Sequence, residues 1–462
     1  MALLIGFLLS IGVGYPFMKF QVQRFAQLIP AVGFLAWFYR RQPPAFFSQP
    51  VIGGWYGLGL VGFVLSAFLA SIFGPASWIS IGFLGLALLQ FGLLPLVRPV
   101  WNEWGRDAVR VLALFAVAVL GIDVGLWVID HVHSITPYAW VIQMSPAGVL
   151  SEAPYAFLNA RWANQAAVLL IWSYIPLLDQ LQSGLIRSRR SFWWFICGLI
   201  PVLASAQIVF SAGRGALVSL VAAAVVMSLL GFREQVGCRR LVVLCVCILL
   251  VSLLMAFSFN YLLTGGEAVV DIARRNAQEL VPAAPDVNKR TVLWTAFLKG
   301  IWSEGLQGVG IGQVAERAPT CTPHSLLLAL LYWTGLPGLI AAAFLATAFV
   351  PRRWAMSGAS LMAVPLLVAL LLYQLVDDIW LRSFSLSLLF VLLPALKSSA
   401  LSGGQLNQPK WLQLFAFPGS TYRLIALTGV LLISLSTVVP GGIGFGPSEL
   451  VSVHGRACML FF

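Results

Sequence analysis

The sequence has few charged residues: Asp, Glu, Lys and Arg together make up 10% of its 462 residues, whereas a soluble domain carries about 25%. Its 6 cysteines form no CxxC motif. The low charge excludes a water-soluble enzyme and a disordered chain, and the sparse cysteines exclude a disulfide-rich secreted scaffold. His131 and His133, with Asp130 beside them, are too few ligands to predict a metal site, and we expect neither a metal nor a cofactor.

Apolar residues, by contrast, make up 60% of the chain, and the mean hydropathy is +0.91. They form runs long enough to cross a bilayer, separated by short polar hinges, which predicts an all-α polytopic membrane protein with about twelve or thirteen spans. We expect residues 1–462 to form a single membrane domain. The candidate spans lie near 1–17, 25–39, 51–73, 76–97, 108–130, 163–180, 191–209, 213–232, 239–263, 325–350, 361–377, 383–396 and 423–439.

Lys and Arg predict the orientation, because cytoplasmic loops of membrane proteins are enriched in them. Four basic hinges, at 181–190, 231–240, 351–353 and 397–423, are assigned to the inside. Arg98 and Arg106 fall on the same side, in a hinge between two spans. The net charge is +12, but the sequence has no basic run long enough to follow a nucleic-acid backbone. Anionic lipids or an anionic substrate are therefore the expected partners of this positive charge.

The complementary hinges then face outward, and the longest of them is the segment 264–323. It contains the run TVLWTAFLKGIW, in which Trp294, Phe297, Leu298 and Ile301 recur at helical spacing. We expect an amphipathic helix lying on the outer membrane face. The other outward segments are 132–161, the short turn at Arg214, and Asp377-Asp378.

Arg214 stands in FSAGRGALVSLV, between two glycines at the outer start of a predicted helix. Small neighbours let a phosphate approach closely, and the amides at a helix N-terminus add positive dipole to the guanidinium. An arginine that anchors a span to lipid headgroups is the alternative interpretation. The flanking glycines weaken that alternative, because an anchor needs none.

Arg290 opens the amphipathic run, which leads to the glycine-rich stretch GVGIG at 308–312. These glycines predict a tight turn that returns the loop to the membrane. They do not predict a P-loop, because no strand precedes them and no GK[ST] follows. Arg275, next to Arg274, is a further candidate contact to an anion, with a solvated charged face as the alternative.

His324 precedes a long apolar run in PHSLLLALL. A single interfacial histidine is most often structural, but this one shares its membrane face with Arg214, Arg290 and the carboxylates Asp377 and Asp378. An imidazole beside two guanidiniums can act as a general base for a hydroxyl that attacks a phosphate-activated centre. Arginine forks can stabilise a departing pyrophosphate without a metal.

The order of SAGRG, an Arg-Trp helix leading to GVGIG, and PHSLLLALL-x-x-TGLPG resembles the signature region of the O-antigen ligase and O-antigen polymerase superfamily. It spans Phe210 to about Leu339. The resemblance implies a GT-C-like membrane fold in which Arg214, Arg290 and His324 line a periplasmic cavity. Asp377 or Asp378 is similar to an acidic residue of a later outer loop. Ser325 stands where the family commonly has Asn, and Trp333-Thr334 where an acidic residue often precedes the glycine.

The resemblance implies a metal-independent, inverting glycosyltransferase of the bacterial inner membrane. Its donor would be a glycan on undecaprenyl pyrophosphate, and its acceptor the lipid A-core oligosaccharide for a ligase or a second lipid-linked repeat for a polymerase. One long outer loop favours the ligase, although the segment 132–162, where Arg161 is a candidate sugar contact, blurs the distinction. An anion transporter is the contrasting class, and the near absence of carboxylates from the predicted spans speaks against it.

Overall fold

The computed structural model describes residues 53–73, 77–133, 160–211, 213–231, 236–265, 290–304, 306–311, 323, 325–347, 358–376, 409–438, 451–453 and 456–458, with isolated positions between 32 and 40. These residues are almost entirely helical, and 5 of the helices are long and apolar enough to cross a membrane. The predicted all-α polytopic membrane fold is therefore confirmed. The total number of spans stays a prediction, because several candidates lie outside the described residues.

The helices follow the predicted apolar runs closely. They are α5 (Gly54–Phe73), α6 (Ser77–His133), α8 (Ala160–Leu170), the 3₁₀ turn η1 (Ile171–Ser173), α9 (Tyr174–Gln182), α10 (Arg190–Phe210), α11 (Arg214–Gly231), α12 (Val236–Thr264), α14 (Arg290–Glu304), α15 (Leu326–Thr347), α16 (Gly358–Val376), α19 (Lys410–Gln413) and α20 (Gly419–Val438). Two short antiparallel strands, β1 (Val451–Val453) and β2 (Arg456–Cys458), were not expected from the sequence.

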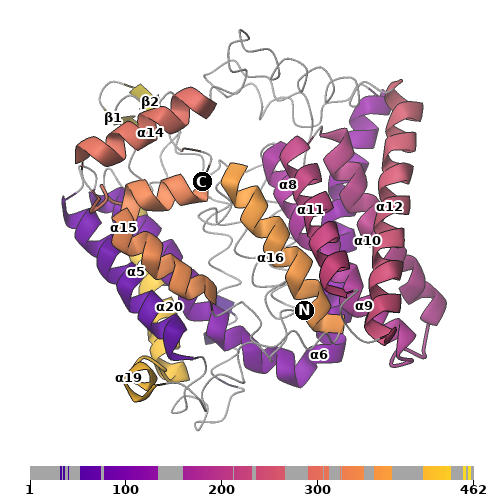
Figure 1. Ribbon diagram of the computed structural model, residues 1–462, viewed down its shortest axis with the longest axis horizontal. Helices are drawn as coiled ribbons and strands as arrows, with labels where there is room; N and C mark the ends of the chain where they lie inside the picture. The colour runs from indigo at the N-terminus through magenta and orange to yellow at the C-terminus, as the bar shows by residue number, and fades with distance from the viewer. Residues whose placement is uncertain are drawn as a thin grey trace.

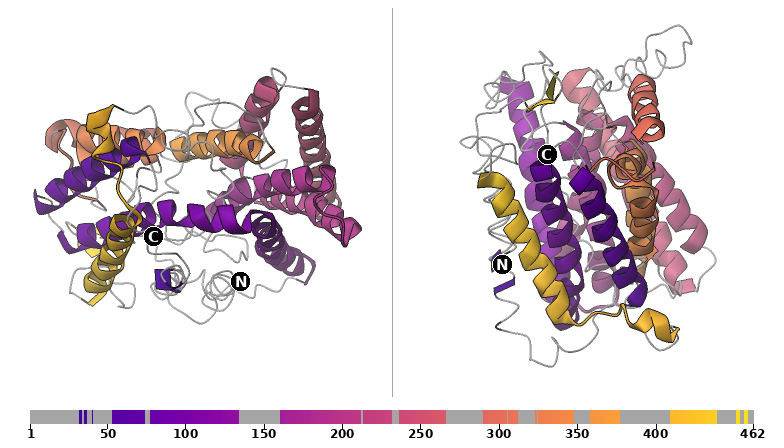
Figure 2. Two further views of the ribbon diagram at one scale, coloured as in Figure 1. Left: turned by 90° about the horizontal axis from the view of Figure 1, so that it is seen from below. Right: turned by 90° about the vertical axis from the view of Figure 1, so that its left-hand side faces the viewer.

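The helices form two groups that lie side by side (Figure 1). One group contains α5, α15, α20 and the first half of α6, and the other contains α8 to α12 and the second half of α6. Helix α16 runs between them and packs against α11, α8 and α9. The right-hand panel of Figure 2 shows α5, α6 and α20 running next to one another. Helix α14 lies across the upper end of the first group and covers the run that was predicted to be an amphipathic helix, whose place on the outer membrane face stays a prediction.

Helix α6 corrects one sequence prediction. We expected two spans separated by a loop that carries Arg98 and Arg106, but the structure has one helix of 57 residues. A straight helix of that length would measure about 85 Å, far more than a bilayer core of about 30 Å. Pro95 and Pro99 each remove a helix hydrogen bond in this stretch, which favours a bend. Figures 1 and 2 show α6 passing from one group of helices to the other.

Glycines set the close packing of the first group. On α6, a Cβ at Gly85 would lie 2.9 Å from the carbonyl oxygen of Gly429 on α20, and one at Gly92 would lie 2.5 Å from the amide nitrogen of Ala426. On α5, Gly59 meets the backbone of α15 in the same way. In a membrane, small residues let helix backbones approach, and van der Waals packing then holds them together.

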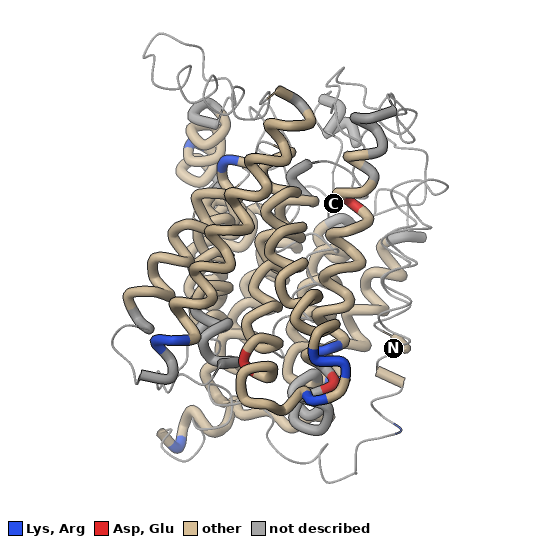
Figure 3. Tube along the Cα trace, turned by 90° about the vertical axis from the view of Figure 1, so that its right-hand side faces the viewer, with Lys and Arg blue, Asp and Glu red and all other residues tan. Residues whose placement is uncertain are grey.

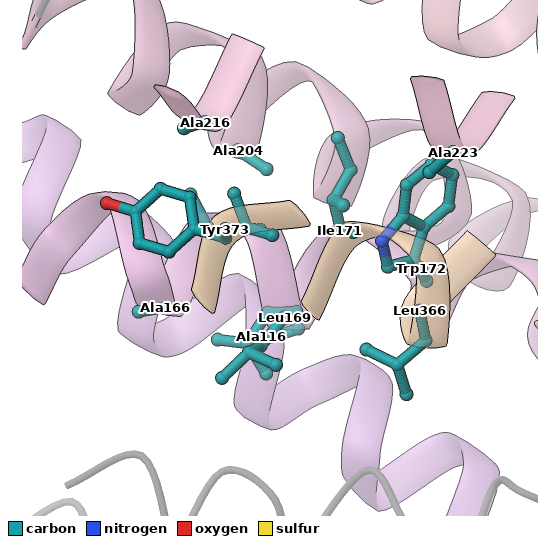
Figure 4. Packing of buried hydrophobic residues seen from close by; sticks show 14 of the residues in the cluster. Ala116, Ala166, Leu169, Ile171, Trp172, Ala204, Ala216, Ala223, Leu366 and Tyr373 are labelled. Carbon is teal, nitrogen blue, oxygen red and sulfur yellow. The ribbon is translucent and has the colours of Figure 1, made fainter. Parts of the chain in front are cut away.

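The second group has a core of large apolar side chains between small ones. Figure 4 shows Trp172 from η1 packed near Ala223 of α11 and Leu366 of α16, and Leu169 of α8 beside Ala116 of α6. Trp172 is fully buried. These contacts join α8, α11 and α16, and α11 is the helix that begins with Arg214.

The charges separate along the helix axes, as the basic hinges predicted. Most of the coloured Lys and Arg residues in Figure 3 gather at one end of the molecule. Arg190 and Arg239 lie at the starts of α10 and α12 at that end, whereas Arg214 begins α11 at the other. The apolar outer faces of the helices, such as Leu254 and Leu262 on α12, are exposed and suit contact with lipid.

Candidate functional site

The turn between α10 and α11 carries Arg214. The amide of Gly213 donates to the carbonyl of Ile208 at 2.9 Å, and the amide of Leu217 donates to the carbonyl of Gly213 at 2.9 Å. Gly213 is therefore the N-cap of α11, and Arg214 is its first helical residue. Arg214 is half-buried, and its place in the first turn adds the positive end of the helix dipole to its charge.

Asn164 of α8 holds this turn from the side. The hydroxyl of Ser211 donates to Oδ1 of Asn164 at 2.6 Å. A Cβ at Gly213 would lie 2.6 Å from Nδ2 of Asn164, so a larger residue at this position would have to displace the carboxamide. From the sequence, we expected the small residues beside Arg214 to leave room for a phosphate. In the structure, the space beside Gly213 is taken by the Asn164 carboxamide, which fixes the direction in which α11 and Arg214 begin.

Polar side chains are buried just below this turn. Three contacts show that α6 and α10 run parallel: the Arg110 guanidinium lies 5.8 Å from the Trp193 ring centre, a Cβ at Gly121 would lie 3.7 Å from Leu203, and Trp127 stacks on Phe210 at 4.1 Å. The offset between the two numberings is 82 or 83, which places Asp123 level with Ser205 and Ala206, next to Gln207 in the chain.

The side chains of Asp123 and Gln207 are each 0% exposed. Helix α12 contributes the buried Asn260 at a similar level, because its neighbour Phe259 lies 6.0 Å from Phe210 of α10 between ring centres. We call this set of side chains the polar layer; its members are Asp123, Asn164, Gln165, Ser205, Gln207 and Asn260. Among the described residues, neither amide atom of Gln207 has a hydrogen-bond partner. Polar groups are costly to bury in a membrane protein and usually mark function.

The polar layer was not predicted from the sequence. The signal was present: Asp123 is a carboxylate inside the predicted span 108–130, and Asn164-Gln165 is an amide pair inside another. Hydropathy averaged over a span hides single polar residues, and only the packing shows that residues from α6, α8, α10 and α12 lie at one level.

The second part of the site is built on a break in α15. The sequence predicted one continuous span over 325–350, but Gly335 has φ 69° and ψ −175°, and the halves of α15 run in different directions (Figure 1). At the break, the amide of Leu336 donates to the carbonyl of Leu306 at 2.9 Å, and Pro337 has no amide hydrogen. The carbonyls of Tyr332 and Trp333 thereby lose their helical donors.

The stretch GVGIG supplies the missing donors. The amide of Val309 donates to the carbonyl of Tyr332, and that of Gly310 to the carbonyl of Trp333, each at 3.0 Å. Gly308 and Gly310 have φ of 85° and 105°, which glycine adopts without strain. The stretch is therefore held against α15, and its glycines let its amides reach the backbone of that helix.

Helix α14 is fixed to the same unit. Phe297 meets Tyr332 edge-to-face at 5.0 Å between ring centres, and Nε1 of Trp294 donates to the carbonyl of Pro323 at 2.9 Å. The buried residues are Leu293, Phe297 and Ile301, four apart, whereas the predicted face also included Leu298, which is 42% exposed. Pro323 and Ser325, on either side of His324 in the chain, are both buried.

The predicted site residues divide into three kinds. Arg214 is fully described. Arg290 is the first residue of α14 and Arg161 the second residue of α8, but only their helical backbones are described. His324, Arg275, Asp377 and Asp378 lie outside the described residues, although α16 ends at Val376, directly before the two carboxylates. The structure thus places Arg214 and Arg290 at the starts of α11 and α14, and Pro323 and Ser325 directly before α15.

One comparison identifies the region around these elements. Residues 199–343 match the family model described as O-antigen ligase. No curated protein matches the chain. The matched residues run from α10, through Arg214, Arg290 and the GVGIG stretch, to the second half of the broken α15. The resemblance seen in the sequence motifs is confirmed: these residues match the O-antigen ligase family model, which supports a function of the O-antigen ligase or polymerase type.

Proposed function

We propose that the protein is an O-antigen ligase-type glycosyltransferase of the bacterial inner membrane. It moves a glycan from undecaprenyl pyrophosphate to a sugar hydroxyl of the lipid A-core oligosaccharide at the periplasmic face. The observation that supports this proposal most is the content of the matched region, residues 199–343. It contains the starts of three helices: α11 begins at Arg214, α14 begins at Arg290, and α15 begins two residues after His324 in the sequence.

In this proposal the chemistry is one inverting displacement. His324 accepts the proton of the acceptor hydroxyl, the hydroxyl oxygen attacks the anomeric carbon of the donor sugar, and the bond from that carbon to the pyrophosphate oxygen breaks. Attack from the face opposite the leaving group inverts the anomeric centre. Arg214 and Arg290 neutralise the charge that develops on the departing undecaprenyl pyrophosphate, so no metal is needed.

The remaining candidates are assigned to binding. Arg161 and Arg275 add cations for the phosphates or hydrogen bonds to the glycan, and Asp377 and Asp378 accept hydrogen bonds from sugar hydroxyls. Arg161 precedes Asn164 by three residues on α8, so both positions lie on one face of that helix. Since Asn164 contacts Ser211 and Gly213, that face is directed toward the start of α11.

The experiment that tests this function is reconstitution of the purified protein with lipid-linked glycan and two competing acceptors. We expect transfer to lipid A-core oligosaccharide and little joining of lipid-linked repeats. Preferential chain extension of the lipid-linked glycan would instead establish a polymerase. Failure to transfer to either acceptor, with a donor that a known ligase accepts, would contradict both assignments.

Asp123 gives one reason to test anion transport as a second class of function. Carriers place ionisable groups within their spans, and Asp123 is the one acidic side chain that is buried in the described part of the chain. We expect proteoliposomes that contain the protein to show no uptake of labelled anion above empty vesicles. Uptake that is abolished by Asp123→Asn would favour a carrier.

A further inference from the structure

Arginines collect at the end of the bundle opposite Arg214. They come from three helices and from the hinge before α10, and we call them the arginine cluster: Arg110, Arg187, Arg189, Arg190, Arg239 and Arg240. The guanidinium of Arg110 lies 5.8 Å from the ring centre of Trp193, which ties α6 to the start of α10. Phe210 at the end of α10 lies 6.0 Å from Phe259 near the end of α12, so the two helices run in the same direction. Arg239 and Arg240, near the start of α12, therefore lie at the same end as Arg190.

The acidic residues that the structure describes at this end are fewer than the arginines. Asp107 pairs with Arg110 at 3.2 Å, and Asp179 lies at this end of α9. Arg190 donates to the carbonyl of Leu181 at 3.4 Å, so its guanidinium is partly used within the protein. Arg187 and Arg189 are exposed and form no ion pair with any residue in the described segments. The cluster therefore has a net positive charge directed outward, where it can attract anions.

The backbone of Arg189 adds a second observation. It adopts φ 51° and ψ 39°, and it is the one residue other than glycine with a positive φ in the described part of the chain. Glycine would take this conformation at less cost, whereas arginine is disfavoured there. The side chain at this position gains nothing from burial, because it is exposed. The guanidinium group is therefore the feature that arginine provides at this position and glycine would not.

Exposed aromatic rings follow the arginines directly. Phe192, Trp194 and Phe195 are 44%, 37% and 63% exposed at the start of α10. Aromatic side chains at the end of a membrane-spanning helix lie at the level of the lipid headgroups and contact the upper part of the acyl chains. The arginines are thus followed by an apolar surface, in the same order as the phosphate and the acyl chains of a phospholipid.

We propose that the arginine cluster binds the phosphate of an anionic phospholipid, with the acyl chains lying along Phe192, Trp194 and Phe195. Guanidinium forks match phosphate oxygens, and basic clusters between helices at a membrane surface attract anionic headgroups. This site lies at the opposite end of the bundle from Arg214, and it stands or falls independently of the proposed transfer reaction.

The test uses the full chain in neutral detergent, with phosphatidylglycerol and phosphatidylcholine of the same acyl chains as probes. Native mass spectrometry measures the lipid retained, and a thermal melt measures the stabilisation that each lipid gives. We expect the wild type to retain phosphatidylglycerol preferentially, with a preference that falls as salt rises. Arg187→Gln and Arg189→Gly should each lower that preference by about fivefold, since each arginine near an anionic surface contributes about 1 kcal/mol.

Two features of the design separate lipid binding from folding. Arg189→Gly suits the left-handed backbone, so its melting temperature without lipid should equal or exceed that of the wild type. Lys410→Gln removes an exposed cation from α19, outside the cluster, and should keep the full preference. Equal retention of both lipids by the wild type, an unchanged preference in both arginine variants, or an equal loss in Lys410→Gln would overturn the proposal.

Discussion

Gly213 and Asn164 show how one contact can decide where a functional arginine stands. Nδ2 of Asn164 is so close to Gly213 that a side chain there would overlap it, and Oδ1 of Asn164 accepts the Ser211 hydroxyl at 2.6 Å. The amide of Gly213 and its carbonyl are both used in backbone hydrogen bonds. The turn therefore has little freedom, and Arg214 leaves it in one direction.

We predict that Gly213→Ala lowers glycan transfer by about tenfold or more, since overpacking of this kind costs about 1–3 kcal/mol and moves the start of α11. Asn164→Ala should partly rescue it, because the second change removes the overlapping group. A double-mutant cycle on transfer rates, with melting temperatures for all four proteins, measures the coupling. Strict additivity of the two changes would show that the contact does not position Arg214.

The proposed chemistry makes a second prediction at the residue scale. His324→Ala should reduce transfer by about 10²–10⁴-fold, the range typical of losing a general base. Arg290→Ala should also abolish detectable transfer while membrane insertion stays intact. Purified variants are assayed on lipid-linked glycan, with gel filtration to confirm the fold. Near wild-type transfer by either variant would remove that residue from the catalytic machinery.

At the scale of an element, α15 and the GVGIG stretch form one unit. The break at Gly335 leaves the carbonyls of Tyr332 and Trp333 without helical donors, and the amides of Val309 and Gly310 replace those donors at 3.0 Å. Helix α14 is attached to the same unit through Phe297 and Trp294. A glycine-rich loop and a Gly-x-Pro break, far apart in sequence, thus have one structural purpose.

We predict that Gly335→Ala destabilises this unit by about 1–3 kcal/mol, because its backbone conformation is essentially restricted to glycine and because a Cβ there would overlap the backbone of Leu306 and Gln307. Thermal melting and limited proteolysis of the segment after α14 measure the effect. Gly198→Ala in α10 is the matched control, since nothing lies within 4 Å of a Cβ at that position, and it should be near neutral. Equal stability of the two variants would contradict the role assigned to the break.

At the scale of the whole molecule, the two ends differ in kind. One end carries the arginine cluster, and the other carries Arg214, the polar layer just beneath it, and α14 lying across the first group of helices. This separation matches the enrichment of basic residues on the cytoplasmic side of membrane proteins. The proposed reaction requires the Arg214 end to face the opposite side of the membrane, where a lipid-linked glycan would be met.

We predict that the two ends react from opposite sides of the membrane. Ser303→Cys, at the exposed end of α14, should be labelled in intact cells by an impermeant maleimide, whereas Ser188→Cys, in the hinge before α10, should be labelled only after permeabilisation. The cysteines are introduced into a chain whose 6 native cysteines are replaced by alanine. The reverse labelling pattern would place the Arg214 end in the cytoplasm and contradict the proposed reaction.

The sequence by itself determined the membrane fold, most of the helix positions and the resemblance to a family. These depend on local features: runs of about 20 apolar residues suffice to predict spans, and the order SAGRG, GVGIG and TGLPG suffices for the resemblance that residues 199–343 confirmed. Local patterns do not predict whether a helix continues or breaks when contacts with distant parts of the chain decide this. The helical stretch between the two spans of α6 and the break inside α15 were both predicted wrongly for this reason.

Only the tertiary structure decided what the motifs do. Hydropathy does not show that Asn164 fills the space beside Gly213, that GVGIG donates to the carbonyls of Tyr332 and Trp333, or that Asp123 lies level with Ser205. Each of these depends on the register between helices, which is set by side-chain packing over long sequence separations. The sequence named Arg214 as a candidate, and the fold supplied the contacts that hold it in place.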